Sequence, residues 1–281
     1  VCAFYLARAG YRVRILERRA IVGGAAVTEE FHPGFRNSTA SYTVSLLHPK
    51  IIRDMRLIDQ GYKVIERPVS NFLPLPDDQY LILGGGIART QAEFAKFSPR
   101  DADALPAYYA SLETVANVIR DLVLTCPPNV GDGMTMMLDA LRQGRHIAAL
   151  TIEQQRDVLD LFTKSARGFL DSWFESDPVK AAFGFDAVVG NYASPDTPGS
   201  AYVLLHHVFG EVNGKKGAWG HVVGGMGSIT QAMARVVQAM GVEVSLEAPV
   251  ARVLVALHVS ANVVTTAGFL VAVGAAYLLS E

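Results

Sequence analysis

The segment Tyr11–Thr28 (YRVRILERRAIVGGAAVT) constrains the fold most, because it joins a short apolar strand to an acidic residue and then to a glycine pair. The strand is expected over Arg12–Leu16 and is followed by Glu17. An acid at the end of the second strand of a dinucleotide-binding βαβ unit is placed to hydrogen-bond a ribose hydroxyl. Before the strand, Val1–Ala9 is predicted to form a helix that ends at Gly10, because glycine tolerates the left-handed conformation common at helix ends.

A helix, a glycine and a strand that ends in an acid make up the second half of a dinucleotide-binding unit. The first strand and its GxGxxG turn would precede Val1, and the helix that begins the chain is the one whose N-terminus receives a pyrophosphate. The sequence therefore predicts an α/β fold in which a Rossmann-like dinucleotide-binding domain is truncated at its start.

Two longer blocks carry a resemblance to a known family. They are Leu16–Pro49 (LERRAIVGGAAVTEEFHPGFRNSTASYTVSLLHP) and Ser194–Ala234 (SPDTPGSAYVLLHHVFGEVNGKKGAWGHVVGGMGSITQAMA). In order and spacing they resemble the phytoene-desaturase-like flavin oxidoreductases, and the resemblance covers roughly residues 1–250. It implies FAD as the cofactor, hydride transfer from a C–H bond of an apolar substrate to the flavin, and a discontinuous FAD-binding domain with a helical insertion.

Composition excludes several classes of function. Half of the 281 residues are apolar and the formal net charge is −2, so neither a nucleic-acid surface nor a polybasic membrane anchor is indicated. The two cysteines, Cys2 and Cys126, are far apart and form no CxxC motif, which excludes a sequence-local redox disulfide and a thiolate zinc site. Such cysteine usage fits a reducing compartment, the cytoplasm of a bacterium or the mitochondrial matrix of a eukaryote.

The pattern of helix signals divides the chain into three parts. Residues 1–85 are expected to form the first segment of the FAD-binding domain, 86–215 a mainly helical substrate domain, and 216–281 a return to the FAD-binding domain. Ser98, Pro99 and Asp101 are typical of a helix start. The helices expected in the central part are Asp101–Thr125, Thr135–Arg142, Thr151–Thr163, Ser165–Phe174 and Val179–Phe185.

The third part begins with a glycine-rich turn and ends in an unusually apolar tail. Ser228 is expected to cap a helix over Ile229–Met240, and Val242–Leu246 is expected to be a strand. From Val253 to Ser280 no Asp, Glu, Lys or Arg occurs, which meets the length criterion for a membrane helix. Polar residues interrupt the first half of this tail, so a buried or partly disordered end, a membrane-inserting tail and an aberrant terminus all remain open.

The candidate cofactor residues follow from the strand–acid–glycine pattern and from the resemblance. Glu17 is the strongest candidate, as a ribose acceptor, against the alternative of a solvated glutamate. The glycines permit close backbone approach to a cofactor, although an ordinary turn would have the same sequence. The resemblance places an arginine near the adenosine phosphate and a backbone contact to the adenine edge. The full set is Glu17, Arg18, Arg19, Gly23, Gly24, Ala25, Thr28 and Val250.

One member of this set, Ala25, departs from the pattern of the family. Many relatives have a phosphate-binding arginine after the glycine pair, whereas here Ala25 stands there, so any phosphate contact from it would be through its backbone. Thr28 is expected to add a hydroxyl donor. Val250 would be indistinguishable from an ordinary core valine.

Candidate substrate residues are Tyr192, on the resemblance alone, and Gly225, Met226 and Gly227, whose small size would let the chain pass close to a flavin or substrate. A helix-entry loop without a ligand explains the glycines equally well. The histidines of LLHHVF, His206 and His207, have no acidic or cysteine ligand nearby in sequence, so a packed pair is favoured over a metal site. No metal site and no catalytic base are assigned.

Two functional interpretations remain. The first is an FAD-dependent oxidoreductase that acts on an apolar small molecule and not on nucleic acid, with peripheral membrane contact and oligomeric state left open. The second is a non-catalytic interaction or regulatory fragment of such a flavoprotein, with apolar surface exposed. Bound flavin distinguishes the two.

Overall fold

The structure of the chain is a computed structural model that describes residues 1–125, 127 and 133–250. Its contacts divide it into two compact units. Unit 1 consists of Val1–Ile65 and the described residues from Gly220 onward, and unit 2 of Glu66–Trp219. The contacts thus separate the units at 65/66 and 219/220, whereas the sequence pattern placed the boundaries at 85/86 and 215/216.

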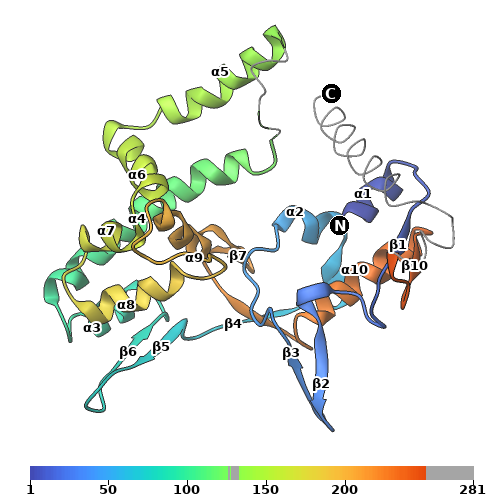
Figure 1. The fold of residues 1–281 in the computed structure, drawn as a ribbon, viewed down its shortest axis with the longest axis horizontal. Coiled ribbons are helices and arrows are strands. Elements are labelled where there is room, and N and C mark those ends of the chain that lie inside the picture. The colour runs from blue at the N-terminus through green and yellow to red at the C-terminus, as the bar shows by residue number, and fades with distance from the viewer. Residues whose placement is uncertain (126, 128–132, 251–281) are drawn as a thin grey trace. The chain divides into compact units, whose positions relative to one another are not determined.

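Unit 1 is built around a parallel strand pair. Strand β1 (Arg14–Leu16) pairs with β10 (Glu243–Ser245), with Ile15 opposite Val244. The ladder continues at both ends, because the Glu243 amide donates to Val13 O and the Glu17 amide donates to Ser245 O. The two expected strands are therefore confirmed, and β10 lies beside β1 although most of the chain separates them (Figure 1).

Helices and short strands complete unit 1. Helix α1 (Cys2–Arg8) is followed by Gly10 at φ +90°, as expected for a glycine after a helix end. Residues from α1, α10 and the segments around 55 and 242 share one apolar core. The remaining elements are η1 (Gly24–Ala26), β2 (Thr28–His32), β3 (Phe35–Ser38), α2 (Pro49–Asp54), η2 (Leu57–Gln60), β9 (Gly220–Val222), α10 (Gly227–Ala239) and β4 (Val64–Glu66), whose last residue belongs to unit 2.

The glycine-rich turn before α10 packs against the β2–β3 hairpin. The amide of Gly227 donates to Thr28 Oγ1 at 2.9 Å, and the amide of Met226 donates to Ser38 Oγ at 3.0 Å. A Cβ at Gly227 would lie 2.6 Å from the Thr28 amide nitrogen, and one at Gly225, which has φ +79°, would lie 2.4 Å from Thr28 Oγ1. Close backbone approach to the hairpin therefore requires both glycines.

The expected cap of this helix is wrong. Helix α10 begins at Gly227, and its N-cap position is Met226. The Ser228 hydroxyl instead donates back to Val223 O and Gly225 O, at 3.0 and 2.8 Å. Ser228 thus closes the turn that leads into the helix, because its side chain is used by the preceding carbonyls.

Unit 2 is mainly helical, and the helices expected there are confirmed with shifted ends (Figure 1). They are α4 (Pro99–Leu122), α5 (Met134–Ala148), α6 (Ile152–Thr163), α7 (Ala166–Asp171) and α8 (Asp177–Asp186). The other elements are β5 (Asn71–Pro74), β6 (Tyr80–Leu83), α3 (Ile87–Phe94), η4 (Ser200–Leu205), α9 (His206–Phe209), β7 (Glu211–Val212) and β8 (Lys215–Lys216). Among the described residues, no helix is both long and apolar enough to cross a membrane.

The core of unit 2 centres on an aromatic cluster. The fully buried Tyr108 of α4 lies with its ring centroid 4.8 Å from that of Phe183 and 4.9 Å from that of Phe174. Phe94 and Trp173 contact the same cluster. Side chains of this size each bury a large apolar area and dominate the stability of a core.

One buried carboxylate links the starts of two helices. Ser98 Oγ caps α4 by accepting from the Asp101 amide at 3.1 Å. Asp101, which is fully buried, accepts from the amides of Glu175 and Ser176 at 2.9 Å each, just before α8. Ser98 Oγ also donates to Glu175 at 2.8 Å. Since these amides have no partner within a helix, Asp101 satisfies donors that burial would otherwise leave unpaired.

Replacing Asp101 by alanine is expected to lower the free energy of unfolding by about 2–4 kcal/mol, because two buried amides lose a charged acceptor. Asp103→Ala is the control: Asp103 is exposed in the same turn, and its loss should cost less than about 1 kcal/mol. Urea unfolding followed by far-UV circular dichroism measures both. Equal losses for the two variants would contradict the assigned role.

Alanine at Gly227 is expected to destabilise unit 1, by about 1–3 kcal/mol, because the new Cβ overlaps the Thr28 backbone. Gly144→Ala, on exposed α5 with open space around the new Cβ, should stabilise by about 0.5–1 kcal/mol through helix propensity. Thermal unfolding of the two variants should therefore shift in opposite directions. A neutral Gly227→Ala would refute the close contact.

Candidate functional site

Glu17 lies at the carboxyl end of β1, where the parallel pair ends. Its backbone is fixed from both sides, since its amide donates to Ser245 O at 2.9 Å and its carbonyl accepts from the Ala248 amide at 2.9 Å. One carboxylate oxygen, Oε1, accepts from the Arg19 amide at 2.8 Å, and the side chain is half-buried. Among the described residues the other oxygen, Oε2, has no hydrogen-bond partner, so it is available to accept from a ligand hydroxyl.

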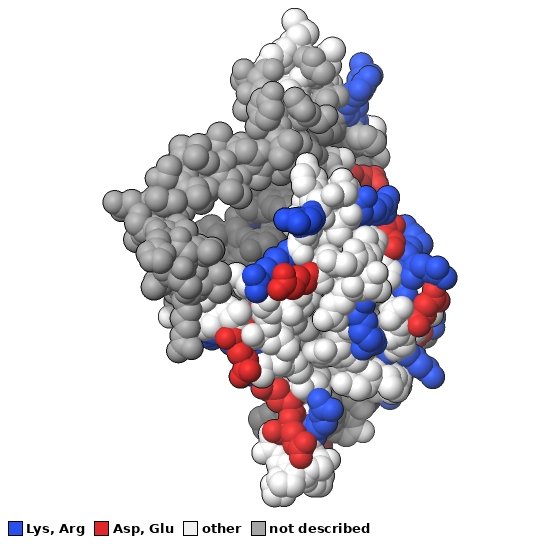
Figure 2. Space-filling view, turned by 90° about the vertical axis from the view of Figure 1, so that its right-hand side faces the viewer, with Lys and Arg blue, Asp and Glu red and all other residues white. Residues whose placement is uncertain are grey.

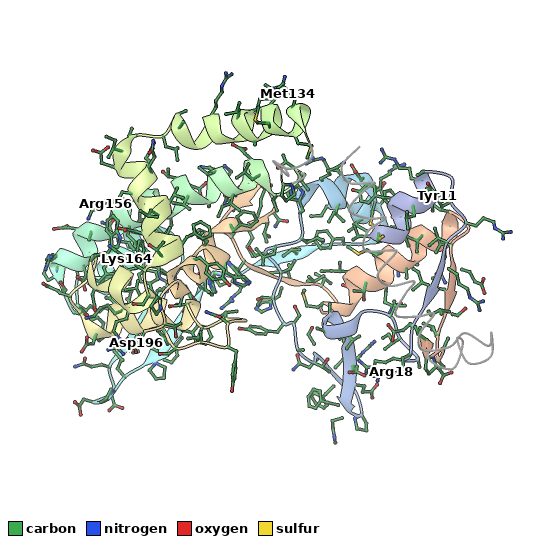
Figure 3. All side chains as sticks on the ribbon, turned by 45° about the horizontal axis from the view of Figure 1, so that its top comes forward. Tyr11, Arg18, Met134, Arg156, Lys164 and Asp196 are labelled. Carbon is green, nitrogen blue, oxygen red and sulfur yellow. The ribbon has the colours of Figure 1, made fainter. Side chains whose placement is uncertain are left out.

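The two arginines after Glu17 differ in their surroundings. Arg18 is exposed and follows β1 in the loop, where Figure 3 labels it. Arg19 forms an ion pair with Glu29 of β2. A partnered guanidinium keeps its charge but holds a fixed position. Arg18 has no ion-pair partner among the described residues.

The glycine pair has two different roles. Gly23, at φ +138°, could not carry a Cβ, which would lie 2.8 Å from Thr230 Oγ1 and 3.0 Å from Val27 Cγ1. Gly24, at φ +57°, and Ala25 are exposed, and no described atom lies within 4 Å of a Cβ built at Gly24. Gly23 therefore packs η1 against α10, and Gly24 leaves open space at the surface.

These residues fit the adenosine half of FAD. Glu17 offers an unpartnered carboxylate oxygen of the kind that accepts from ribose hydroxyls. The amides of Gly24 and Ala25 begin η1, where the first N–H groups have no acceptor within the turn. Together, the Glu17 acceptor suits a ribose, and the two amides with Arg18, which is nearby in sequence, suit a phosphate.

Packing contacts occupy the remaining candidates of unit 1 near α10, which are Thr28, Gly225, Met226 and Gly227. The Thr28 side chain is 6% exposed, and its hydroxyl oxygen already accepts from the Gly227 amide. Met226 is 8% exposed. The glycines face the hairpin, as described above. Their sizes are therefore explained by contacts between elements, and a role toward cofactor or substrate remains a prediction.

The last two candidates are exposed. Val250 is 52% exposed and is the last residue before a segment that lies outside the described residues. Tyr192, in unit 2, is fully exposed and has no ring contact with another described residue. The apolar tail 253–280 and Cys126 also lie outside the described residues, while Cys2 is a free, exposed thiol.

The histidine pair is packed, as favoured from the sequence. The ring of His207 stacks on Trp219 with centroids 4.9 Å apart and an angle of 23°, and His206 lies 5.2 Å from the same ring. The Trp219 Nε1–H donates to His207 O at 3.1 Å. Within the described part of the chain, no group of three or more potential metal ligands occurs.

An acidic neighbour of the histidine pair, which sequence spacing did not indicate, is present in the structure. Asp186, at the end of α8, lies with Oδ1 3.1 Å from His207 Nε2. Burial raises the pKa of Asp186 to about 7, and burial lowers the pKa of His207 to about 4. Asp186 and His207 are 21 positions apart in sequence, a spacing that matches no local motif, so only the fold brings them together.

On the face shown in Figure 2, both Lys or Arg and Asp or Glu side chains are exposed. In unit 2, Asp160 lies between Arg156 and Lys164, which Figure 3 labels, and pairs with both.

Comparison with known proteins agrees with this geometry. The model of the family "flavin containing amine oxidoreductase" matches residues 1–272. The rat pyridine nucleotide-disulfide oxidoreductase domain-containing protein 2 is 37% identical over 273 residues, which is 91% of this chain and 46% of that protein. The chain therefore spans about half the length of this relative. A limonene dehydrogenase polypeptide of Castellaniella defragrans is 34% identical over 114 residues, 40% of this chain and 21% of that one.

Solved structures support the fold. Wild-type putrescine oxidase bound to putrescine superposes with a TM-score of 0.50 at 17% identity, over 88% of this chain and 48% of that one. At this identity the likeness concerns the fold alone. The α/β fold and the resemblance to flavin oxidoreductases are confirmed, and the chain belongs to the flavin containing amine oxidoreductase family, whose members are FAD-dependent oxidoreductases.

Proposed function

We propose that this chain binds FAD through unit 1 and belongs to an enzyme that oxidises a C–H bond of an apolar substrate, in the manner of phytoene-desaturase-like proteins. The observation that carries the proposal is the placement of Glu17, fixed at the end of the β1–β10 pair with one carboxylate oxygen unpartnered among the described residues. Bound flavin supplies the hydride acceptor. Glu17 orients the ribose, and the exposed amides of Gly24 and Ala25 donate to the phosphates.

Support for an apolar substrate comes from two sides. Half of the residues are apolar, and unit 2 exposes large apolar side chains such as Ile152 (80%), Leu159 (61%) and Phe162 (47%). One relative is named for limonene, a hydrocarbon. Putrescine oxidase, in contrast, is named for an amine and resembles this chain in fold only. We further propose that the substrate is a small apolar molecule and that nucleic acid is not a partner. The same proposal includes peripheral contact with a membrane and a location in a reducing compartment.

Glu17→Gln is expected to weaken FAD binding about 10-fold, because a neutral amide is a poorer acceptor for ribose hydroxyls than a carboxylate. Glu243→Gln is the control, since Glu243 lies on the neighbouring strand β10 and pairs with Arg14. Titration of the purified chain with FAD, followed by flavin fluorescence, gives the dissociation constants. If the unaltered chain binds no FAD, the cofactor role fails and the interaction-fragment alternative gains support.

A hydrocarbon with allylic C–H bonds is expected to bleach the bound flavin under anaerobic conditions, whereas putrescine should not. The physical reason is that desolvating an ammonium group is costly without a buried charged partner. Flavin absorbance after addition of limonene, a longer polyprenoid or putrescine measures the difference. Bleaching by putrescine alone would overturn the apolar-substrate proposal and leave FAD binding intact.

A further inference from the structure

The described part of unit 2 contains a cluster of buried polar groups that the proposed FAD site does not use. Asp186 is 8% exposed, and His207 Nδ1, His206 Nδ1 and Tyr108 OH are buried without a hydrogen-bond partner. Unpaired buried polar atoms are rare in folded proteins, and a cluster of them is typical of a site with a specific role. All of these groups lie in unit 2, so the explanation does not depend on FAD binding.

We propose that Asp186 and His207 form an acid–base site that holds one exchangeable proton, and that exchange of this proton reverses the tautomer of His207. Asp186 Oδ1 and His207 Nε2 are 3.1 Å apart but not yet aligned as a hydrogen bond. A small rotation of the carboxyl group aligns them. In the protonated site the carboxyl donates to Nε2 and Nδ1 carries a hydrogen. When the site loses one proton to solvent, the remaining proton lies on Nε2, which donates to the carboxylate.

Burial and the α8 dipole both favour the neutral carboxyl. Asp186 is the last residue of α8, where the unpaired carbonyls carry partial negative charge and disfavour a carboxylate. Burial raises its pKa to about 7, and lowers that of His207 to about 4, with His206 and Arg67 adding to the second effect. An imidazolium–carboxylate ion pair is therefore disfavoured on both sides.

Two other neighbours stabilise the deprotonated form. Asn71 donates a side-chain hydrogen bond to Asp186, and the positive charge of Arg67 favours the carboxylate. From α4, Tyr108 and Tyr109 face Asp186, and burial raises the pKa of Tyr109 to about 12, so both hydroxyls stay protonated at neutral pH. The site therefore changes by one proton on the carboxyl, while the imidazole stays neutral.

The basic side chains Lys180 and Arg120 of the packed helices are engaged elsewhere. Lys180 of α8 pairs with Asp171 and Asp177. Arg120 of α4 pairs with Glu113 and donates to the backbone carbonyls of Val208 and Phe209. Trp219 stacks its uncharged ring on the His207 imidazole and donates only to the His207 backbone carbonyl, so it adds no charge to the site. The titration is thus governed by the groups named above.

The consequence concerns His207 Nδ1. When the carboxyl is protonated, Nε2 accepts and Nδ1 carries the hydrogen; when it is ionised, Nε2 carries the hydrogen and Nδ1 is an acceptor. Nδ1 therefore changes from a hydrogen-bond donor in mildly acidic solution to an acceptor in mildly basic solution. No charge need appear on the histidine for this reversal.

The test is nitrogen-15 NMR of the full chain labelled at histidine, from about pH 5.5 to about pH 8.5. The expected result is a neutral His207 throughout, with its tautomer reversing near pH 7, close to the pKa of Asp186. His207→Gln assigns the signal. Asp186→Asn should abolish the reversal, whereas Asp196→Asn, which removes an exposed carboxylate of unit 2 labelled in Figure 3, should leave it unchanged.

Imidazolium signals for His207 at about pH 6, or a tautomer that stays constant across the range, would overturn the proposal. If Asp186→Asn fails to fold, infrared difference spectra of the unaltered chain labelled with carbon-13 aspartate decide the question. A buried protonated carboxyl band that disappears with a midpoint near pH 7 supports the site, and its absence refutes it.

Discussion

The parallel pairing of β1 with β10 is the contact on which unit 1 depends. It joins the first strand of the chain to the last described one, and its hydrogen bonds extend to Val13 and Glu17 beyond the central pair. Parallel strands cannot be joined by a tight turn and need a long crossover, so every element between them must fold in a way that returns the chain to this edge. The position of Glu17 is a direct product of this pairing.

The second constraint on unit 1 is the close approach of the 224–227 turn to the β2–β3 hairpin. The side-chain oxygens of Thr28 and Ser38 accept hydrogen bonds from the amides of Gly227 and Met226. Both Gly227 and Met226 are buried. A glycine-rich turn at the start of a helix is common in dinucleotide-binding proteins, and here much of that glycine content is explained by packing. Gly24, by contrast, has open space around it. The same residue type therefore serves two purposes within one unit.

Much of the fold could be predicted from sequence, because the responsible patterns are local. Helices with clear caps, such as α6 with the capping box of Thr151 and Gln154, appear where expected. The strands β2, β3 and β5 were missed, since short strands with exposed, mixed residues lack a regular alternation. Ser228 was misassigned because a serine before an apolar run resembles a cap whether or not its hydroxyl faces the helix.

The sequence by itself determined the family, the α/β class and the candidate Glu17, since each follows from residue types at short, fixed spacing. Only the tertiary structure decided which glycines are packed and which are open, and it alone brought Asp101 to the start of α8 and Asp186 to His207. Burial is the physical reason: a carboxylate acquires its partners and its pKa from residues distant in sequence, and no local pattern encodes those distances.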